Sequence, residues 1–351
     1  MCGIYGVLSK SRLADEDYRR FDDLGSQLRH RGPDESSTLR APRWLLGMHR
    51  LAIIDLENGG QPFWDGTNSV AVLGNGEIYN AASLRRELSE TGYRFKSSSD
   101  IEVVAHLYAA KGIGGLSELE GMFALCIVDI AEREAVLVRD RLGEKPLLYG
   151  HEGDRFWFSS ELRPLIRSGI FRAHINDDAV EEFLLTGFVR EQVQWIDGIS
   201  KLEPGSYLRV DFDSLETSQA FYWLMAPGRQ PPGGTPDWPT LLDSAVASTL
   251  VSDVPLALAL SSGLDSSVIA ALASRRRKDL QALTVGYSDS EQSDESHGAR
   301  SIAEWLGIGW HRVTVCSENV GRSFQETCEM RDEPIADMAG PAYEAIAIRA
   351  K

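Results

Sequence analysis

Short apolar stretches bounded by turn residues mark the first part of the chain and predict β-strands. Their ranges are 69–73, 123–128, 135–138 and 156–159. Two segments between them, 81–91 and 100–111, carry apolar residues at helical spacing, and Asp100 stands where the second helix needs an N-cap. The pattern predicts a first domain that mixes α and β structure.

A segment rich in proline and glycine follows the next apolar strand, 207–212. Residues 225–239 hold too many helix and strand breakers for a core element. We therefore expect a first domain over 1–212, a linker over 213–239 and a second domain over 240–351.

Helical and apolar strand patterns alternate beyond the linker. The predicted order is a helix at 240–251, a strand at 255–260, a helix at 266–276 and a strand at 280–286. This alternation is typical of a parallel sheet with crossover helices. A last helical pattern runs over 342–351.

Composition narrows the class of protein. The 351 residues, 43% of them hydrophobic, are enough for about two globular domains. A net charge of −16 disfavours nucleic acid or an anionic membrane as a partner, because both need clustered Lys and Arg. No apolar run approaches the length of a membrane span, and no signal peptide is visible at the N-terminus.

The four cysteines lie far apart, at positions 2, 126, 316 and 328. This spacing argues against a zinc site and against a disulfide scaffold. We therefore expect reduced thiols, a cytoplasmic protein and no zinc or organic cofactor.

Cys2 is the first candidate for chemistry. Removal of Met1 would leave one residue that holds both a thiol and a free α-amino group, with ordinary pKa values of about 8.5 and 8. The amine can then take the thiol proton without a histidine partner. The alternative is that a small residue simply follows the initiator methionine.

Polar clusters elsewhere in the first domain suit an amide-hydrolysing pocket. Attack by a thiolate creates an oxyanion, and Asn75 with the backbone N–H of Gly76 supplies neutral donors for it. Arg50 suits an α-carboxylate and Asp100 an α-ammonium group, with Glu77 assisting. Together these residues predict selection of free glutamine.

Each of these residues has a structural alternative. Asn75-Gly76 is also a strong hairpin-turn signal, and Arg50 and Asp100 could be members of surface ion pairs. His30 and His49 are expected to be ordinary hydrogen-bonded histidines outside the catalytic set. The acidic residues at 177–178 and 181–182 read as a charged helix start.

Six ordered motifs in the first domain carry a family resemblance. They are Cys2-Gly3-Ile4, Arg31-Gly32-Pro33-Asp34, His49-Arg50-Leu51, the segment 74–80, the segment 120–124 and the segment 139–143. They resemble class II glutamine amidotransferases, and their order, continuing through 158–161, most resembles the glutamine-hydrolysing asparagine synthetases.

The resemblance implies an α+β N-terminal-nucleophile domain, an αββα sandwich, followed by a parallel-sheet α/β nucleotide-binding domain. The positions that match the family's glutamine site are Cys2, Arg50, Leu51, Ala52, Ile53, Ile54, Asn75, Gly76, Glu77 and Asp100.

The second domain has its own motif, Leu260-Ser261-Ser262-Gly263-Leu264-Asp265-Ser266-Ser267, between a strand and a helix. Backbone N–H groups and the helix dipole make such a turn an anion cradle, although it is not a GxxxxGK[ST] P-loop. It resembles the pyrophosphate loop of enzymes that adenylate a carboxylate, which implies ATP with Mg²⁺. The implied ATP residues are Leu260, Ser261, Ser262, Gly263, Asp265, Ser266 and Val285, with Asp265 as a candidate metal ligand.

Further acidic motifs, 294–295 and 332–337, match the same domain, but two features depart from the family pattern. Ser262 stands where the first glycine of the loop is expected, which puts ATP affinity in doubt. The chain also stops at Lys351, before the family's second phosphate motif, so we expect an incomplete synthetase domain. It would be a truncated gene product, an artificial piece or a protein completed by another chain.

We therefore expect an asparagine synthetase-type enzyme. Glutamine hydrolysis at Cys2 would supply ammonia to an ATP-activated carboxylate, with aspartate as the default acceptor. The products would be asparagine, glutamate, AMP and pyrophosphate, and the assembly either a homodimer or a complex with a completing synthetase chain. Three alternatives stay open: a glutaminase-only or ammonia-delivering subunit, an enzyme that amidates another carboxylate, and a non-catalytic relic that binds glutamine or nucleotide.

Overall fold

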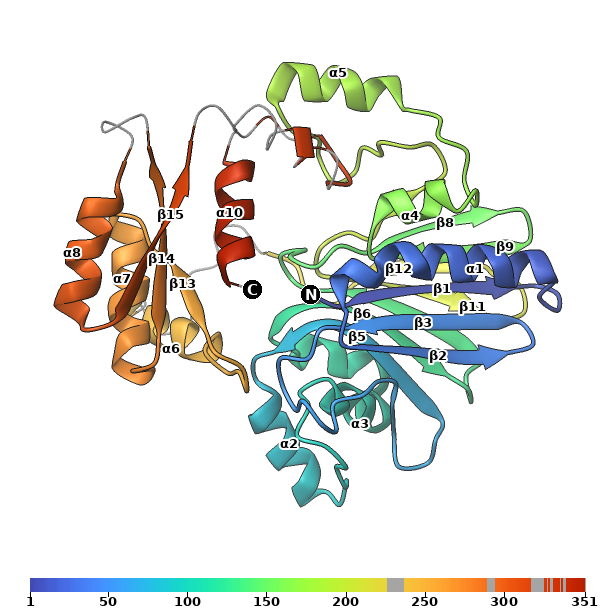
Figure 1. The fold of residues 1–351 in the computed structure, drawn as a ribbon. Helices are drawn as coiled ribbons and strands as arrows, with labels where there is room; N and C mark the ends of the chain where they lie inside the picture. The colour runs from blue at the N-terminus through green and yellow to red at the C-terminus, as the bar shows by residue number, and fades with distance from the viewer. Residues whose placement is uncertain are drawn as a thin grey trace. The chain divides into compact units, whose positions relative to one another are not determined.

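The computed structural model describes residues 1–225, 237–288, 294–316, 325–326, 328, 331–334, 336 and 339–350. It divides into two compact units, 1–227 and 228–351. Figure 1 shows the helices and strands of each unit, coloured from the N-terminus in blue to the C-terminus in red.

Two antiparallel sheets form the first unit. One has the order β10-β8-β9-β1-β3-β2 and the other β12-β11-β7-β6-β5-β4. The strands of the first sheet are β1 (Gly3–Ser9), β2 (Glu35–Ala41), β3 (Trp44–Arg50), β8 (Leu148–Glu152), β9 (Arg155–Ser159) and β10 (Ser200–Lys201). Those of the second are β4 (Phe63–Trp64), β5 (Val70–Ile78), β6 (Gly121–Asp129), β7 (Glu134–Arg139), β11 (Ser206–Asp211) and β12 (Thr217–Phe221).

Helices cover the outer faces of both sheets. The α-helices of this unit are α1 (Asp15–Leu28), α2 (Ala81–Glu90), α3 (Glu102–Lys111), α4 (Leu162–Arg167) and α5 (Asp177–Thr186), and the 3₁₀ turns are η1 (Arg29–Arg31) and η2 (Gly112–Glu118). One apolar cluster joins α1 and α4 to the first sheet, another joins α2 and α3 to the second, and a third lies between the sheets. This is the αββα sandwich that the resemblance implied, so the predicted fold class is confirmed for this unit.

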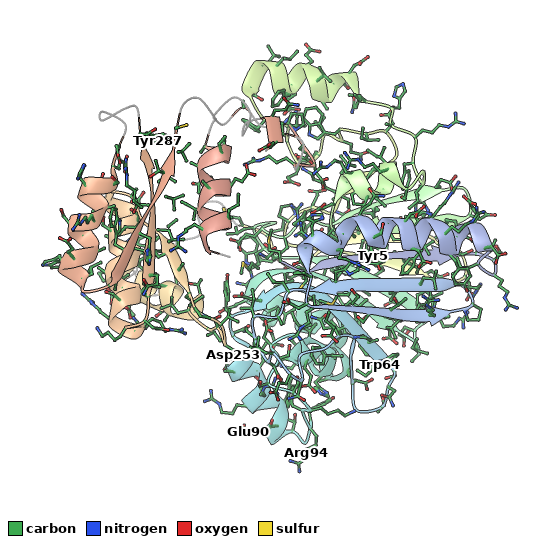
Figure 2. All side chains as sticks on the ribbon, viewed as in Figure 1. Tyr5, Trp64, Glu90, Arg94, Asp253 and Tyr287 are labelled. Carbon is green, nitrogen blue, oxygen red and sulfur yellow. The ribbon has the colours of Figure 1, made fainter. Side chains whose placement is uncertain are left out.

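Alternation along the central strands explains the layering. In β6, Phe123, Leu125 and Ile127 face the helical layer, whereas Ala124 and Cys126 face the other sheet. On β1, Tyr5 packs against Phe21 of α1 with ring centroids 4.8 Å apart, and Figure 2 labels Tyr5 on this strand. Glu90 and Arg94, at the far end of α2, are exposed and point away from the sheets (Figure 2).

The second unit is a small parallel α/β layer. Strands β13 (Ala257–Ala259), β14 (Gln281–Tyr287) and β15 (Gly309–Val315) pair in parallel. Helices α6 (Trp238–Ser248), α7 (Leu264–Arg276) and α8 (Ser296–Leu306) share one apolar cluster with the strand ends, and α10 (Gly340–Ala350) lies on the other side of the sheet (Figure 1). The predicted parallel sheet is confirmed.

Some expected boundaries were wrong. Strand β12 lies inside the predicted linker because 217–221 pair with β11, and Pro239 belongs to the first turn of α6, where a missing N–H costs nothing. Linker residues 226–236 and two positions of the acidic motif, 335 and 337, lie outside the described residues.

Two local expectations near the site also need correction. Asn75 and Gly76 do not form a hairpin turn, because both lie within β5 and pair with Ala124 and Phe123 of β6. Asp100 is not the N-cap of α3. The helix starts at Glu102 with Ile101 as N-cap, and the Asp100 carboxylate accepts the N–H of Ile78 instead.

Candidate active site

A cavity of about 90 Å³ opens in the first unit. One water needs only about 15 Å³, so a small organic molecule fits at least in part. The cavity is lined by Met1, Cys2, Arg50, Leu51, Ile53, Ile54, Gln61, Asn75, Gly76, Glu77, Ser99, Asp100, Ile101, Met122 and Lys145. All the predicted glutamine-site residues except Ala52 are therefore brought together.

Cys2 lies directly before β1, and its backbone and thiol are both held. The guanidinium Nε of Arg31 donates to the Cys2 carbonyl at 2.9 Å, and the thiol Sγ lies 3.8 Å from the Leu51 carbonyl oxygen. Burial raises the pKa of the Cys2 thiol, while the Leu51 hydrogen bond and the positive charges of the terminal amine, Arg50 and Arg31 oppose that rise. The thiol is thus desolvated but surrounded by groups that favour a thiolate.

Asn75 is the most informative residue of the cavity. Its side chain is fully buried, and neither Nδ2 nor Oδ1 has a hydrogen-bond partner among the described residues. A buried amide without partners costs about 1–3 kcal/mol, so its presence calls for a ligand that pairs with it. The amide lines the same cavity as the Cys2 thiol.

Gly76 follows with a φ of +147°. A Cβ built there would lie 1.9 Å from the Met122 carbonyl oxygen, so only glycine permits β5 to approach β6 in this way. The position fixes the direction in which Asn75 enters the cavity.

Arg50 anchors the 51–55 loop. Its Nη2 donates to the carbonyls of Ile54 at 2.9 Å and Asp55 at 2.7 Å, and its Nη1 lies 3.3 Å from Glu35. Some N–H donors of the buried guanidinium are therefore used within the protein. Arg50 offers fewer donors to a ligand in the cavity than the sequence suggested.

Two acidic side chains, Glu77 and Asp100, share the cavity. Burial raises the pKa of Asp100, against the hydrogen bond from Ile78. Burial, together with the charge of Asp100, raises the pKa of Glu77, and Lys145 opposes that rise. The pair offers negative charge to a positively charged group.

Sequence reasoning missed Gln61, Ser99, Ile101, Met122 and Lys145 as lining residues. Lys145 is the one with a charge, and its signal was its place two residues after the 139–143 motif. The Gln61 side chain stabilises the fold, since its amide donates to the Gly74 carbonyl and accepts the Gly74 N–H.

The two histidines of the arginine-rich turns are hydrogen-bonded, as expected. His49 bridges the Gly25 carbonyl and the Ser36 hydroxyl, at 2.7 Å each, and burial lowers its pKa. His30 bonds to Glu161, which also receives Arg31. Neither histidine lines the cavity.

In the second unit, the predicted phosphate loop lies between β13 and α7, with Gly263 as N-cap. Leu260 is buried, the Ser261 and Ser266 hydroxyls lie 2.8 Å apart, and Val285 lies on β14. Asp265 stands in the first turn of α7. The described residues contain no group of three or more His, Cys, Asp or Glu arranged to hold a metal, so the metal assignment stays a prediction.

Glu295 occupies the donors of this loop. Its carboxylate accepts the Ser262 N–H at 3.0 Å and the Ser262 hydroxyl at 3.2 Å. A carboxylate held by these donors shows that the loop offers hydrogen bonds suited to an anion.

Among the described residues, no helix is both long and apolar enough to cross a bilayer. The four cysteines are free thiols.

Comparison with family models matches residues 1–223 to a glutamine amidotransferase domain and residues 237–350 to asparagine synthase. Among curated relatives, the chain is 31% identical over 329 residues to asparagine synthetase (glutamine-hydrolyzing) 2 of Bacillus subtilis, covering 89% of this chain and 44% of that protein. It is 33% identical to a probable asparagine synthetase (glutamine-hydrolyzing) of Dictyostelium discoideum, covering 89% and 54%. The chain thus spans about half the length of the curated relatives it matches.

Among solved structures, the glutamine phosphoribosylpyrophosphate amidotransferase of Bacillus subtilis, complexed with ADP and GMP, aligns over 95% of this chain and 71% of its own. The identity is 18% and the TM-score 0.45.

Proposed function

The chain belongs to the glutamine amidotransferase family, and we propose that its first unit hydrolyses the side-chain amide of glutamine with Cys2 as the nucleophile. The observation that carries this proposal is the pairing of a held thiol with the partnerless Asn75 amide in one small cavity. A thiol and an unused amide donor are what attack on a carboxamide requires.

The reaction follows from these groups. With Met1 removed, the α-amino group of Cys2 takes the thiol proton, and the thiolate attacks the side-chain carbonyl of glutamine. The oxyanion of the tetrahedral intermediate receives the Nδ2–H of Asn75 and the N–H of Gly76. The α-ammonium group of Cys2 returns its proton to the amide nitrogen, and collapse of the intermediate releases ammonia and leaves a thioester on Cys2. Water, deprotonated by the same α-amine, then hydrolyses the thioester to glutamate and the free thiol.

Recognition of free glutamine uses the charged lining. Arg50 faces the α-carboxylate with the donors that the 51–55 loop leaves available, and Glu77 with Asp100 receives the α-ammonium group. Leu51, Ile53 and Ile54 line the same cavity and exclude water from the thiol, while Ala52 holds the loop, since its N–H bonds to Asp34 at 2.8 Å.

We further propose that the ammonia amidates a carboxylate activated by ATP in the second unit, with aspartate as the first candidate. The support is the match of 237–350 to asparagine synthase and the names of the relatives. Ammonia must react before it is protonated, because ammonium is not a nucleophile. All four thiols are free, which suits the reducing cytoplasm as the working compartment.

ATP would supply the adenylate, with Mg²⁺ screening the phosphates. The loop of Ser261, Ser262 and Gly263 would hold the pyrophosphate portion, because the N–H and hydroxyl of Ser262 already bind the Glu295 carboxylate. Nucleotide and Glu295 then compete for the Ser262 N–H.

This competition gives a test. Glu295→Gln should bind MgATP several-fold more tightly than the parent chain, measured by calorimetry, because the competing negative charge is gone. The matched control is Glu304→Gln on the same helix, which pairs with the exposed Arg300 and should leave affinity unchanged. Weaker binding by Glu295→Gln would instead make Glu295 a ligand-holding residue.

Cys2→Ala should abolish glutamate release from glutamine while leaving any ammonia-dependent, ATP-dependent synthesis. Glutamate, AMP and pyrophosphate are measured over a panel of carboxylate acceptors. Glutaminase activity that survives in Cys2→Ala would exclude Cys2 as the nucleophile.

A second candidate is an ammonia-delivering glutaminase without synthesis of its own. The observation that favours it is Glu295 on the phosphate loop. Glutamate release without AMP from any acceptor, in the parent chain and in Glu295→Gln alike, would select it.

A further inference from the structure

Lys145 is a buried cation in the cavity that the proposed reaction does not use. Its side chain is 7% exposed and lines the cavity with Cys2 and Glu77. Among the described residues, its Nζ has one neighbour within hydrogen-bond range, Sδ of Met1 at 3.5 Å, and removal of Met1 takes that neighbour away. A buried ammonium group without a close anionic partner is unusual, so the position of Lys145 requires an explanation.

The backbone around Lys145 is built to hold it there. Asp140, fully buried at the end of β7, accepts the N–H groups of Glu144 at 3.0 Å and Lys145 at 2.9 Å. The Arg139 guanidinium Nε donates to the Lys145 carbonyl at 3.0 Å. The loop therefore fixes where the Lys145 side chain enters the cavity.

The two carboxylates in the cavity, Glu77 and Asp100, explain why a positive charge lies there. Two like charges in one buried cavity repel, and without a cation one of them takes up a proton. The charged groups that act on Glu77 are Asp100 from the turn before α3, Lys145 from the β7–β8 loop and the α-amino group at the start of the chain, which is that of Met1 here and that of Cys2 once Met1 is removed. The cation that acts on Asp100 is Arg85 of α2. The groups that act on Lys145 are Glu77, Glu144, Arg31 and Asp140.

We propose that Lys145 is a positioning residue of the glutamine site: its ammonium group keeps Glu77 charged beside Asp100, so that the two carboxylates can together receive the α-ammonium group of the substrate. This inference rests on the proposed glutaminase function. Lys145 itself does not contact the reacting amide.

The sign of the expected pH effect follows directly. Removing Lys145 makes one carboxylate of the pair hold its proton up to a higher pH. Because substrate binding needs both carboxylates charged, the acid-side loss of affinity then begins at a higher pH. Above that range both acids ionise again and affinity returns.

The test measures glutamine binding by calorimetry between pH 5 and 8, in the full chain carrying Cys2→Ser so that no turnover occurs. Adding Lys145→Met should move the pH at which glutamine affinity falls on the acid side up by about one unit, so that affinity in that pH range drops about tenfold. Affinity near pH 8 should be almost unchanged. Lys145→Arg should restore the parent curve. Lys111→Met, which removes a surface cation bound to Glu87 and Glu118, is the matched control.

A second ligand separates this role from a direct contact with the substrate carboxylate. 4-Carbamoylbutanoate lacks the α-ammonium group, so its binding should not show the upward shift in Lys145→Met. A loss of affinity in Lys145→Met that is equal at all pH values, or equal for both ligands, overturns the proposal. A pH curve of Lys145→Met that superimposes on the parent curve overturns it as well. Lys145→Gln repeats the measurement if the methionine variant does not fold. Failure of the Cys2→Ser parent to bind glutamine at any pH would instead refute the proposed function.

Discussion

Neither polar atom of the buried Asn75 amide has a hydrogen-bond partner among the described residues, which costs the fold stability and leaves the amide free for a ligand. Asn75→Ala should lower kcat for glutamine hydrolysis by about 10²–10³-fold, the usual effect of losing one oxyanion donor, with little change in KM. The melting temperature should not fall in proportion, because an unsatisfied buried amide is removed at the same time.

Steady-state kinetics and thermal unfolding on the same preparation check this. A kcat within tenfold of the parent would remove Asn75 from the mechanism, whereas a collapse in stability would assign it to the fold.

At the same scale, sequence reasoning identified the cavity residues that lie in recognisable motifs but missed others, among them Gln61, Met122 and Lys145. Cys2, Asn75 and Asp100 belong to short motifs whose chemistry can be stated residue by residue. Gln61 and Met122 enter the cavity only through the pairing of β5 with β4 and β6, which no residue type announces. Lys145 is placed by hydrogen bonds to a buried Asp140, a contact that a linear pattern does not contain.

At the scale of the element, the start of α3 holds the loop that carries Asp100. Glu102, 2% exposed, accepts the N–H of Lys96 at 2.7 Å and the N–H and hydroxyl of Ser97 at 2.9 and 2.6 Å. Burial raises the pKa of Glu102, but hydrogen bonds from Ser97 and Lys96, together with the His106 ring 3.8 Å away, lower it to about 2. The loop is therefore held by a carboxylate that stays charged in the folded protein.

The sign of the linkage follows from that lowered pKa. The contribution of Glu102 to stability is complete above its unfolded pKa of about 4.3 and is lost as the pH falls toward 2. Glu102→Gln should therefore be less stable than the parent at pH 7, by about 2 kcal/mol, and the difference should shrink below pH 4. Urea unfolding at several pH values measures it, and parallel pH profiles for the two proteins would contradict it.

Continuous apolar strands were predictable, and strands shaped by pairing were not. Strands β6 and β7 match their predicted ranges because each buries both faces in apolar layers. Strand β5 runs five residues past its predicted end at Leu73, since the glycines and polar residues of 74–77 are held by β6 rather than by their own propensity. Strand β12 is wholly exposed and carries no apolar signal.

At the scale of the molecule, all the residues that line the cavity with Cys2 belong to the first unit. The first unit has three apolar clusters of its own and brings the N-terminus, the loop after β3, strand β5, the turn before α3 and the β7–β8 loop to one cavity. Periodicity predicted strands and helices, and the family resemblance implied the layers. The strand order and register that bring these five segments together were not predicted from the sequence. The second unit contains the predicted parallel sheet, and its reaction with ATP is a proposal.

The central claim is that Cys2, with its own freed amine, is the nucleophile of this cavity. The most direct measurement is labelling of the purified chain with a glutamine analogue that carries a chloroketone in place of the carboxamide, followed by peptide mass spectrometry. One adduct is expected, on a peptide that begins with Cys2 and has a free amine. Added glutamine should protect Cys2 from labelling. An adduct on another residue, or a labelled peptide that still begins with Met1, would contradict it.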